Sequence, residues 1–400
     1  MKRKTFKLTA ALLLMAGFNS LTAQTDSINV VTTAVPFLRI SPDARAGGMG
    51  DLGVATSADA NSAFWNLAKV PFAEKNFSIG LTYTPWLKDL GLNDVYLLAL
   101  AGYYKIDELQ AFSGSVRYFS LGNIQFTNPN GDYWGDGRPR EFGVDVGYAR
   151  KLSDKIGLGI ALRYINSNLA AGAPSTGTAY KAGSTVAGDL SFFYSGTQAT
   201  GSGWNFGATL SNLGGKVGYT NDATQRDYIP ANLSIGTTYT AAIDETNKIQ
   251  FGLDLHKLLV PTPPKFSATG NSDYDDSVNT VLVTKYRDKG AVGSWFSSFG
   301  DAPGGFKEEL REFQVSVGAE YAYNDQFFVR AGYFYEDKNK GNRKYFTVGL
   351  GLKYNVFGLN FSYLVPSGSG VNRNPLSNTL RFGLVFDLDD SGSSSSSSNQ

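Results

Sequence analysis

The single histidine, His256, is the one residue on which a catalytic triad or a histidine-ligated metal centre could be built. Asp254 shares its face of a predicted strand, 247–258, so the Asp254 carboxylate could orient the imidazole. The opposite face of this strand carries Phe251, Leu253 and Leu255. An enzyme that acts on membrane lipid needs its catalytic group on the lipid-facing side. We therefore expect His256 to be a polar residue of the inner face and predict no catalytic residue.

Metal and thiol chemistry have little support in the sequence. There is no cysteine, so disulfides, thiolate metal sites and an acylated cysteine are excluded. Acidic residues gather in two predicted loops without the regular ligand spacing of a calcium site, at Asp132, Asp136, Asp273, Asp275 and Asp276. We predict solvated loops and no metal site. The net charge of +1 gives no sign of a nucleic-acid partner.

The stretch Gly48-Met49-Gly50-Asp51-Leu52-Gly53 has the glycine spacing of a dinucleotide-binding loop. No hydrophobic strand leads into it, and Val54-Ala55-Thr56 follows where that fold needs the start of a helix. A glycine-rich turn packed closely against other backbone explains the same residues. We therefore expect no nucleotide or other cofactor.

From Phe77 onward the chain alternates with a period of two. In one segment an apolar face, Ile156, Leu158, Ile160, Leu162 and Tyr164, opposes Gly157, Gly159, Ala161 and Arg163. Such a segment is typical of a strand half-buried in an apolar medium. The segments are about ten residues long, and this is the length that a tilted strand needs to cross a bilayer. The composition, with 46 Gly, 22 Tyr, 27 Phe and 18% charged residues, also favours a membrane barrel.

Fourteen such segments are predicted, near 77–86, 94–106, 110–120, 141–152, 155–167, 184–195, 203–213, 230–241, 247–258, 312–323, 326–336, 343–355, 358–366 and 378–388. Connections after the even-numbered segments are short, whereas those after the odd-numbered segments are mostly long. This sorting is typical of a bacterial outer-membrane barrel and has no counterpart in a soluble sandwich. The predicted fold class is therefore all-β, a transmembrane antiparallel β-barrel of about 14 strands over residues 77–388.

The two ends of the chain have other roles. Residues 1–23 resemble a cleaved secretory signal peptide, with an early positive cluster, a short apolar stretch and a cleavage site at Leu21-Thr22-Ala23. Residues 24–76 do not alternate, and we expect them to fold inside the barrel as a plug, because wall side chains cannot fill so wide a lumen. Residues 389–400 form a serine-rich tail, which we expect to be disordered.

Charged residues on the inner face could line a hydrophilic path. We expect them instead to pair with one another and with the plug, because buried ions need partners. They are Arg117, Asp145, Arg163, Asp189, Asp254, Glu320, Arg330, Lys353 and Asp387.

The connection 259–311 is far longer than a turn requires. It carries four aromatic residues, Trp295, Phe296, Phe299 and Phe306. Exposed aromatic side chains on a surface loop are typical of a binding site, so we predict that these four residues bind cargo or another partner. The same rings could alternatively cover the barrel mouth as a lid.

The plug segment carries a family resemblance. Its residues from Arg45 through Ala68 include Ala46-Gly47-Gly48-Met49-Gly50 and Phe64-Trp65-Asn66-Leu67-Ala68. This stretch resembles the N-terminal hatch of the FadL-like outer-membrane family, in which a hatch precedes a fourteen-stranded barrel. Asn66-Leu67-Ala68 stands where the family usually has Asn-Pro-Ala. The resemblance implies the hatch residues Arg45, Gly48, Gly50, Gly53, Trp65 and Asn66.

A second stretch, Pro36 to Arg45 with the sequence Pro-Phe-Leu-Arg-Ile-Ser-Pro-Asp-Ala-Arg, is more discriminating. It is similar to the PorV family, the FadL-like barrels of the type IX secretion system of Bacteroidetes. This resemblance implies a cell outer membrane protein that receives cargo with a C-terminal signal from the translocon barrel. It would present the cargo to the cell-surface sortase, in contact with outer-membrane lipid or lipopolysaccharide.

Two alternatives also come from the resemblance. A FadL-like barrel could be a channel for hydrophobic small molecules, with the hatch as its gate. Because a relative has been linked to lipopolysaccharide deacylation, the chain could also be a lipid A deacylase centred on His256. We expect the secretion role, without enzymatic activity.

Overall fold

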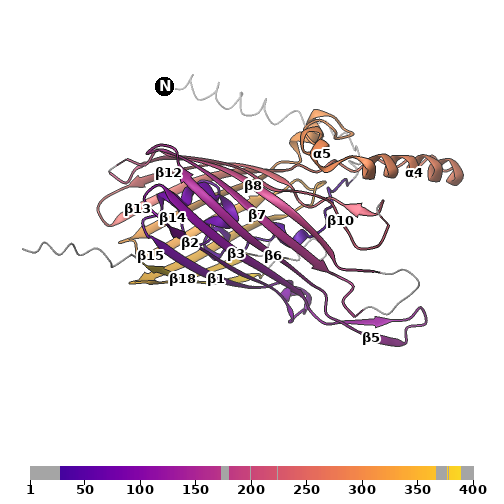
Figure 1. Cartoon of the computed structure of the whole chain (residues 1–400), viewed down its shortest axis with the longest axis horizontal. Coiled ribbons are helices and arrows are strands. Elements are labelled where there is room, and N and C mark those ends of the chain that lie inside the picture. The colour runs from indigo at the N-terminus through magenta and orange to yellow at the C-terminus, as the bar shows by residue number, and fades with distance from the viewer. Residues whose placement is uncertain are drawn as a thin grey trace, which may run out of the picture.

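The computed structural model describes residues 28–172, 180–198, 200–222, 224–365, 376 and 378–388; the predicted signal peptide and serine-rich tail lie outside them. Fourteen strands form one closed antiparallel barrel, in which β1 pairs with both β2 and β18 (Figure 1). The predicted fold class is confirmed. Closure leaves no free sheet edge, as a strand structure in a bilayer requires.

The barrel strands agree with the predicted segments, and no end differs by more than two residues. They are β1 (Phe77–Pro85), β2 (Val95–Lys105), β3 (Gln110–Leu121), β6 (Arg140–Lys151), β7 (Ile156–Asn168), β8 (Gly183–Ser195), β9 (Gly203–Gly214), β12 (Asn232–Ala242), β13 (Asn247–Leu258), β14 (Gln314–Tyr323), β15 (Phe327–Tyr335), β16 (Lys344–Tyr354), β17 (Phe357–Val365) and β18 (Leu380–Leu388).

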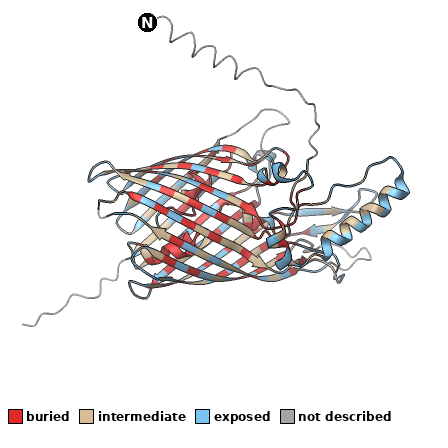
Figure 2. Ribbon diagram, turned by 90° about the horizontal axis from the view of Figure 1, so that it is seen from above, coloured by how far each residue is buried: buried red, intermediate tan, exposed pale blue. Residues whose placement is uncertain are grey.

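The apolar face of each strand points outward. On β7, Ile160 and Leu162 are 58% and 63% exposed. Arg163, the next residue, points to the other face and is only 3% exposed. Exposed and buried residues alternate along the strands in the same way around the barrel (Figure 2). A soluble sandwich would place the apolar face inside, so this arrangement requires an apolar surrounding. Among the described residues, no helix is long and apolar enough to cross a membrane.

The connections sort by length between the two ends of the barrel. Short turns, such as those between β2 and β3 and between β16 and β17, meet at one end, here called the short-turn mouth. The opposite end, the long-loop mouth, carries small extra elements: η3 (Lys88–Leu90), the hairpin β4 (Ile124–Thr127) and β5 (Tyr133–Gly137), and the hairpin β10 (Val217–Gly218) and β11 (Arg226–Asp227).

The long connection between β13 and β14 differs from the predicted loop, because it contains three helices. These are α4 (Ser272–Asp288), α5 (Ala291–Ser297) and α6 (Phe306–Leu310). The Asn271 side chain accepts a hydrogen bond from the Tyr274 amide and so caps α4, and Asp273 and Asp275 lie in its first turn. Acidic residues there are favoured by the helix dipole. The acidic cluster is therefore the start of a helix and not a loop tip.

Residues 28–76, here called the hatch, run through the lumen. They form η1 (Pro36–Arg39), α2 (Ala44–Gly47), α3 (Ser62–Trp65) and η2 (Leu67–Phe72). The hatch starts at the long-loop mouth, where the Asn29 amide donates to the Asn339 carbonyl at 3.0 Å. It ends at the short-turn mouth, where the Asn76 carbonyl accepts from the Lys105 amide at 2.8 Å.

Glycines of the wall lie against the hatch and are here called the glycine band. They are Gly147, Gly157, Gly159, Gly207, Gly236, Gly252, Gly318, Gly332 and Gly349. A Cβ atom at Gly332 would overlap the Met49 carbonyl carbon, and one at Gly207 would lie 2.5 Å from the Val54 carbonyl oxygen. The small residues on the inner face of the alternating pattern therefore leave the space that the hatch backbone occupies.

Replacing Gly332 by Val should unseat the hatch, because the new side chain would overlap hatch backbone that cannot rotate away. We expect a loss of stability at or above the roughly 1–3 kcal/mol typical of overpacking. Gly358→Val is the matched control, since a Cβ there lies 3.5 Å from its nearest neighbour, Val385 Cβ. Trypsin cleavage after the hatch residue Arg45 in the detergent-solubilised barrel measures the effect, and equal cleavage of both variants would contradict the packing argument.

Candidate functional site

Arg45 fastens the hatch to the barrel wall. Its Nε and Nη2 donate to the two carboxylate oxygens of Glu320 at 3.0 and 2.8 Å, and its Nη1 donates to Asp59 at 2.9 Å. Glu320, on β14, also accepts from Nε of Arg330 at 2.6 Å. A buried carboxylate between two guanidinium groups is well compensated, so this cluster fixes the position of α2 against β14 and β15.

The glycine-rich turn of the hatch is held through its backbone. The amides of Gly53 and Val54 donate to the Asp254 carboxylate at 2.8 and 2.9 Å, and the Gly50 amide donates to Thr347 Oγ1 at 2.8 Å. These amides would be the phosphate donors of a dinucleotide-binding loop. They are already bonded to the wall, which agrees with the interpretation of this stretch as a packed turn.

Gly53, Trp65 and Asn66 pack together inside the hatch. A Cβ atom at Gly53 would overlap the Trp65 ring, so only glycine fits beneath the indole. The Asn66 side-chain amide donates to the carbonyls of Val54 and Phe192, each at 2.9 Å, and so links the turn to β8. Gly48 lies against Gly349 of the wall. Of the hatch residues singled out from the sequence, Gly53 and Trp65 contact each other, while Arg45, Gly48 and Asn66 contact the barrel wall.

The inner-face charges pair as predicted. Arg163 contacts Asp145 and donates to Asp189, while Lys353 lies 2.8 Å from Asp387. His256 also lies on the inner face, with Nδ1 2.9 Å from Ser234 Oγ. The Asp254 carboxylate is bonded to hatch amides and does not orient the imidazole. The structure therefore does not assemble the histidine–aspartate pair that the sequence raised as an alternative.

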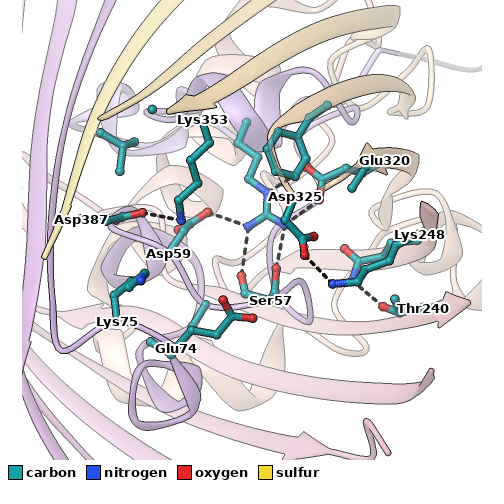
Figure 3. Close-up of a pocket in the computed structure, with 18 of the residues that line it drawn as sticks. Ser57, Asp59, Glu74, Lys75, Thr240, Lys248, Glu320, Asp325, Lys353 and Asp387 are labelled. Atoms are coloured by element: carbon teal, nitrogen blue, oxygen red, sulfur yellow. Dashed lines mark hydrogen bonds and ion pairs between the residues drawn. The ribbon is translucent and has the colours of Figure 1, made fainter. Parts of the chain in front are cut away.

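Two cavities lie on opposite sides of the hatch among the described residues. The larger, about 420 Å³, opens at the short-turn mouth and is surrounded by Ser57, Asp59, Glu74, Lys75, Lys248, Asp325, Lys353 and Asp387 (Figure 3). Two ion pairs, Lys248 with Asp325 at 2.6 Å and Lys353 with Asp387 at 2.8 Å, lie at its edge. The smaller cavity, about 120 Å³, lies on the other side of the hatch and shares no lining residue with the larger.

Helices α5 and α6 form a shoulder on the outside of the barrel, here called the rim shoulder (residues 291–310). Figure 1 shows α5 beside the base of α4. Lys257 of β13 locates it: Leu253 and Leu255, on the same outward face, are exposed, but Lys257 is only 1% exposed. The Lys257 ammonium donates to Glu309 at 3.3 Å and to Glu312 at 2.6 Å. The shoulder therefore covers the outer wall where it reaches the long-loop mouth.

A second lysine, Lys340, joins the shoulder to the β15–β16 connection. Its ammonium donates to Glu308 at 2.8 Å and to Glu312 at 2.9 Å. Partial burial would raise the pKa of Glu308, but the hydrogen bonds from Lys340 and the Gly304 amide hold that pKa below its ordinary value. Glu308 is therefore ionised at neutral pH and able to keep this contact.

The predicted binding aromatics lie on the shoulder. Phe296 and Phe306 are each 76% exposed and Phe299 is 49% exposed, whereas Trp295 is partly buried. The Phe299 ring lies 5.7 Å from the Lys257 ammonium, on the outer side of β13, so this ring does not lie over the barrel mouth. The start of the hatch lies near the long-loop mouth, where Val35 and Phe37 pack against the wall.

Helix α4 extends away from the barrel and has no buried residue (Figure 1). Its C-terminal end is held by Tyr228, whose hydroxyl donates to the carbonyls of Tyr286 at 3.0 Å and Lys289 at 2.7 Å. Burial raises the pKa of Tyr228 to about 12, so the hydroxyl stays protonated and can donate. No signal of period two could predict this contact, because it depends on a side chain about sixty residues away.

An apolar exterior, fourteen strands and a lumen occupied by the N-terminal segment define a FadL-like outer-membrane barrel. The toluene transporter TbuX of Ralstonia pickettii has this fold, with a TM-score of 0.51 at 12% identity over 86% of this chain and 97% of TbuX. A Pseudomonas aeruginosa FadL homologue is also similar, with a TM-score of 0.46 at 12% identity over 90% of this chain and all of that chain.

The family model of type IX secretion system protein PorV matches residues 22–265, more than half of the chain. This protein belongs to the PorV family. Among curated proteins, no sequence gives a significant match. The family and fold agree with the predicted outer-membrane barrel.

Replacing Glu320 by Gln should loosen the hatch, because Arg45 and Arg330 would lose their shared carboxylate. Removing one partner of a buried ion pair costs about 3–5 kcal/mol. Asp325→Asn is the control, since its pair with Lys248 is exposed and worth about 0–1 kcal/mol. Conductance of the purified barrel in planar bilayers is the measurement: we expect open events for Glu320→Gln and few for the control. Closed behaviour of both variants would show that Glu320 does not hold the hatch.

Proposed function

We propose that this barrel handles cargo for type IX secretion: it binds secreted proteins through their C-terminal signal, receives them from the translocon barrel and presents them to the surface sortase. Membership of the PorV family supports the secretion role. The rim shoulder is the observation that supports a binding role for the outer surface. It exposes large apolar side chains at the long-loop mouth. In bacterial outer-membrane barrels the long loops lie on the extracellular side, so the proposal places these side chains where cargo would emerge.

The composition of the shoulder fits partner binding. Phe296, Phe299 and Phe306 are joined by Val292, 59% exposed, and Leu310, 55% exposed. Clustered exposed aromatic side chains are frequent anchors of protein interfaces. The base of the shoulder is held rigid by Lys257 and the glutamates beneath it. A rigid base lowers the entropy lost on binding, so the patch is suited to capture.

The lumen supports the same choice over a hydrophobic channel. TbuX is a toluene transporter by its title, but here the hatch is bonded to the wall by Arg45, Glu320 and Asp254. Ion pairs lie at the edge of the larger cavity. An apolar solute gains little from such a surface, because desolvating charges costs energy. The proposal includes no catalytic step and no cofactor.

Exchanging Phe296 and Phe306 together for Ser in the chromosomal gene should impair cargo capture. Each buried aromatic anchor of an interface contributes about 2 kcal/mol or more, so co-purification of signal-bearing cargo should fall at least about tenfold. Cargo should then remain unprocessed and cell-associated. The matched control is Tyr274→Ser with Val281→Ser on α4, where both side chains are exposed, at 55% and 67%.

Heat-modifiable migration shows whether each variant still folds as a barrel. Normal cargo processing in the folded shoulder variant would contradict the binding assignment.

A strain that lacks the whole protein separates the secretion role from a channel. The proposal expects blocked secretion there, whereas a channel would leave secretion normal and reduce uptake of hydrophobic compounds.

A further inference from the structure

The smaller cavity, here called the upper pocket, lies between the hatch and the long-loop mouth. Its volume is about 120 Å³, and its lining combines hatch and wall: Arg39, Ser41, Trp65, Arg117, His256 and Arg343. A cavity of this size holds several waters or one small ion, since a single water needs about 10–15 Å³ of such space. Its polar lining distinguishes it from an apolar void.

Two buried donors of the upper pocket have no acceptor among the described residues. They are Nε1 of Trp65 and Nε of Arg117, and Oγ of Ser41 is also without a partner there. An indole N–H and a guanidinium N–H can only donate. A buried donor left unpaired is costly, and native structures rarely leave one so. The lining therefore calls for an acceptor inside the pocket.

The charge of the lining is positive. Arg39 and Arg343 share one carboxylate, Glu336, at 3.3 and 2.8 Å. Arg117 lies 4.0 Å from Asp145, which is more closely engaged by Arg163. Three guanidinium groups thus line the pocket with incomplete compensation, which favours an anion over a neutral acceptor.

One lining carboxylate, Asp51, is already engaged by the wall. It accepts from the Tyr345 hydroxyl at 2.6 Å and lies 3.6 Å from the Arg381 guanidinium. The other oxygen of Asp51, Oδ1, accepts no hydrogen bond from a described residue. The lining nevertheless stays positive, because three guanidinium groups face one carboxylate, whose charge is shared with Arg381.

The upper pocket can be reached from the long-loop mouth. The side chains of Arg39 and Arg343 remain 23% and 26% exposed, whereas Arg117 is only 4% exposed. The arginines therefore run from the solvent into the lumen. An anion that moves inward past these side chains loses its water molecules one after another and gains a guanidinium contact for each. This stepwise exchange lowers the free energy cost of desolvating the anion.

We propose that the upper pocket binds a small oxyanion group, a carboxylate or a phosphate, which enters from the long-loop mouth. The guanidinium groups of Arg39, Arg117 and Arg343 provide charge, and the Trp65 indole donates one hydrogen bond. This binding is separate from cargo capture at the rim shoulder, and neither requires the other.

Calorimetric titration of the full mature protein in non-ionic detergent tests the proposal. Sodium acetate and inorganic phosphate are the probes, each against chloride buffer of equal ionic strength. We expect at least one probe to bind saturably with one ion per chain. Trp65→Phe keeps the ring and removes the N–H, so its affinity should fall about tenfold, as for one hydrogen bond to a charged group.

Trp204→Phe is the matched control, because Trp204 lies on the outer wall and is 52% exposed; its affinity should be unchanged. Arg343→Gln is a second variant, in a surface connection, and should also bind about tenfold more weakly. A tripeptide with a free C-terminal carboxylate and the same tripeptide with an amidated C-terminus are then compared. Binding of the first but not the second would show that the pocket accepts a carboxylate that is part of a larger molecule. Acetate binding without peptide binding would indicate a free ion. Failure of both acetate and phosphate to saturate, or wild-type affinity in both pocket variants, would overturn the proposal.

Discussion

The close approach of the hatch backbone to the glycine band is the constraint on which this structure depends. A wall of fourteen strands encloses more space than its own side chains can fill. Here the wall has glycine at positions such as Gly207, Gly318 and Gly332, and the backbone of the hatch occupies the space that side chains would fill. Where the hatch meets the glycine band the interior is packed as closely as a protein core, because main chain contacts main chain there.

The close packing of the hatch determines how the buried carboxylates of the wall are paired. Once the hatch is seated, the carboxylates of Asp254 and Glu320 are cut off from water and need donors. The hatch provides these as the Gly53 amide and the Arg45 guanidinium. Buried ion pairs contribute less to stability than to register, because their desolvation cost offsets much of the attraction. The polar contacts therefore fix where the hatch sits, while the glycine band makes room for it.

A filled lumen moves binding to the ends and the outside. The rim shoulder depends on Lys257, whose charge would be untenable on a lipid-facing wall without Glu309 and Glu312. The same arrangement keeps Phe296 and Phe306 exposed at the rim. The lining of the upper pocket differs, because three arginines face a single carboxylate there, and this excess of positive charge is the basis for the proposed anion site.

The sequence by itself determined the strands, their facing and their number, because a period-two pattern is local and a bilayer allows only a closed barrel. It also separated hatch from wall. It did not predict the helix α4, although Asn271, Asp273 and Asp275 carry start signals. It also did not predict the shoulder that buries Lys257 on the outer face of β13. Only the tertiary structure decided these features and the upper pocket, because they depend on side chains from distant segments that meet after the barrel closes.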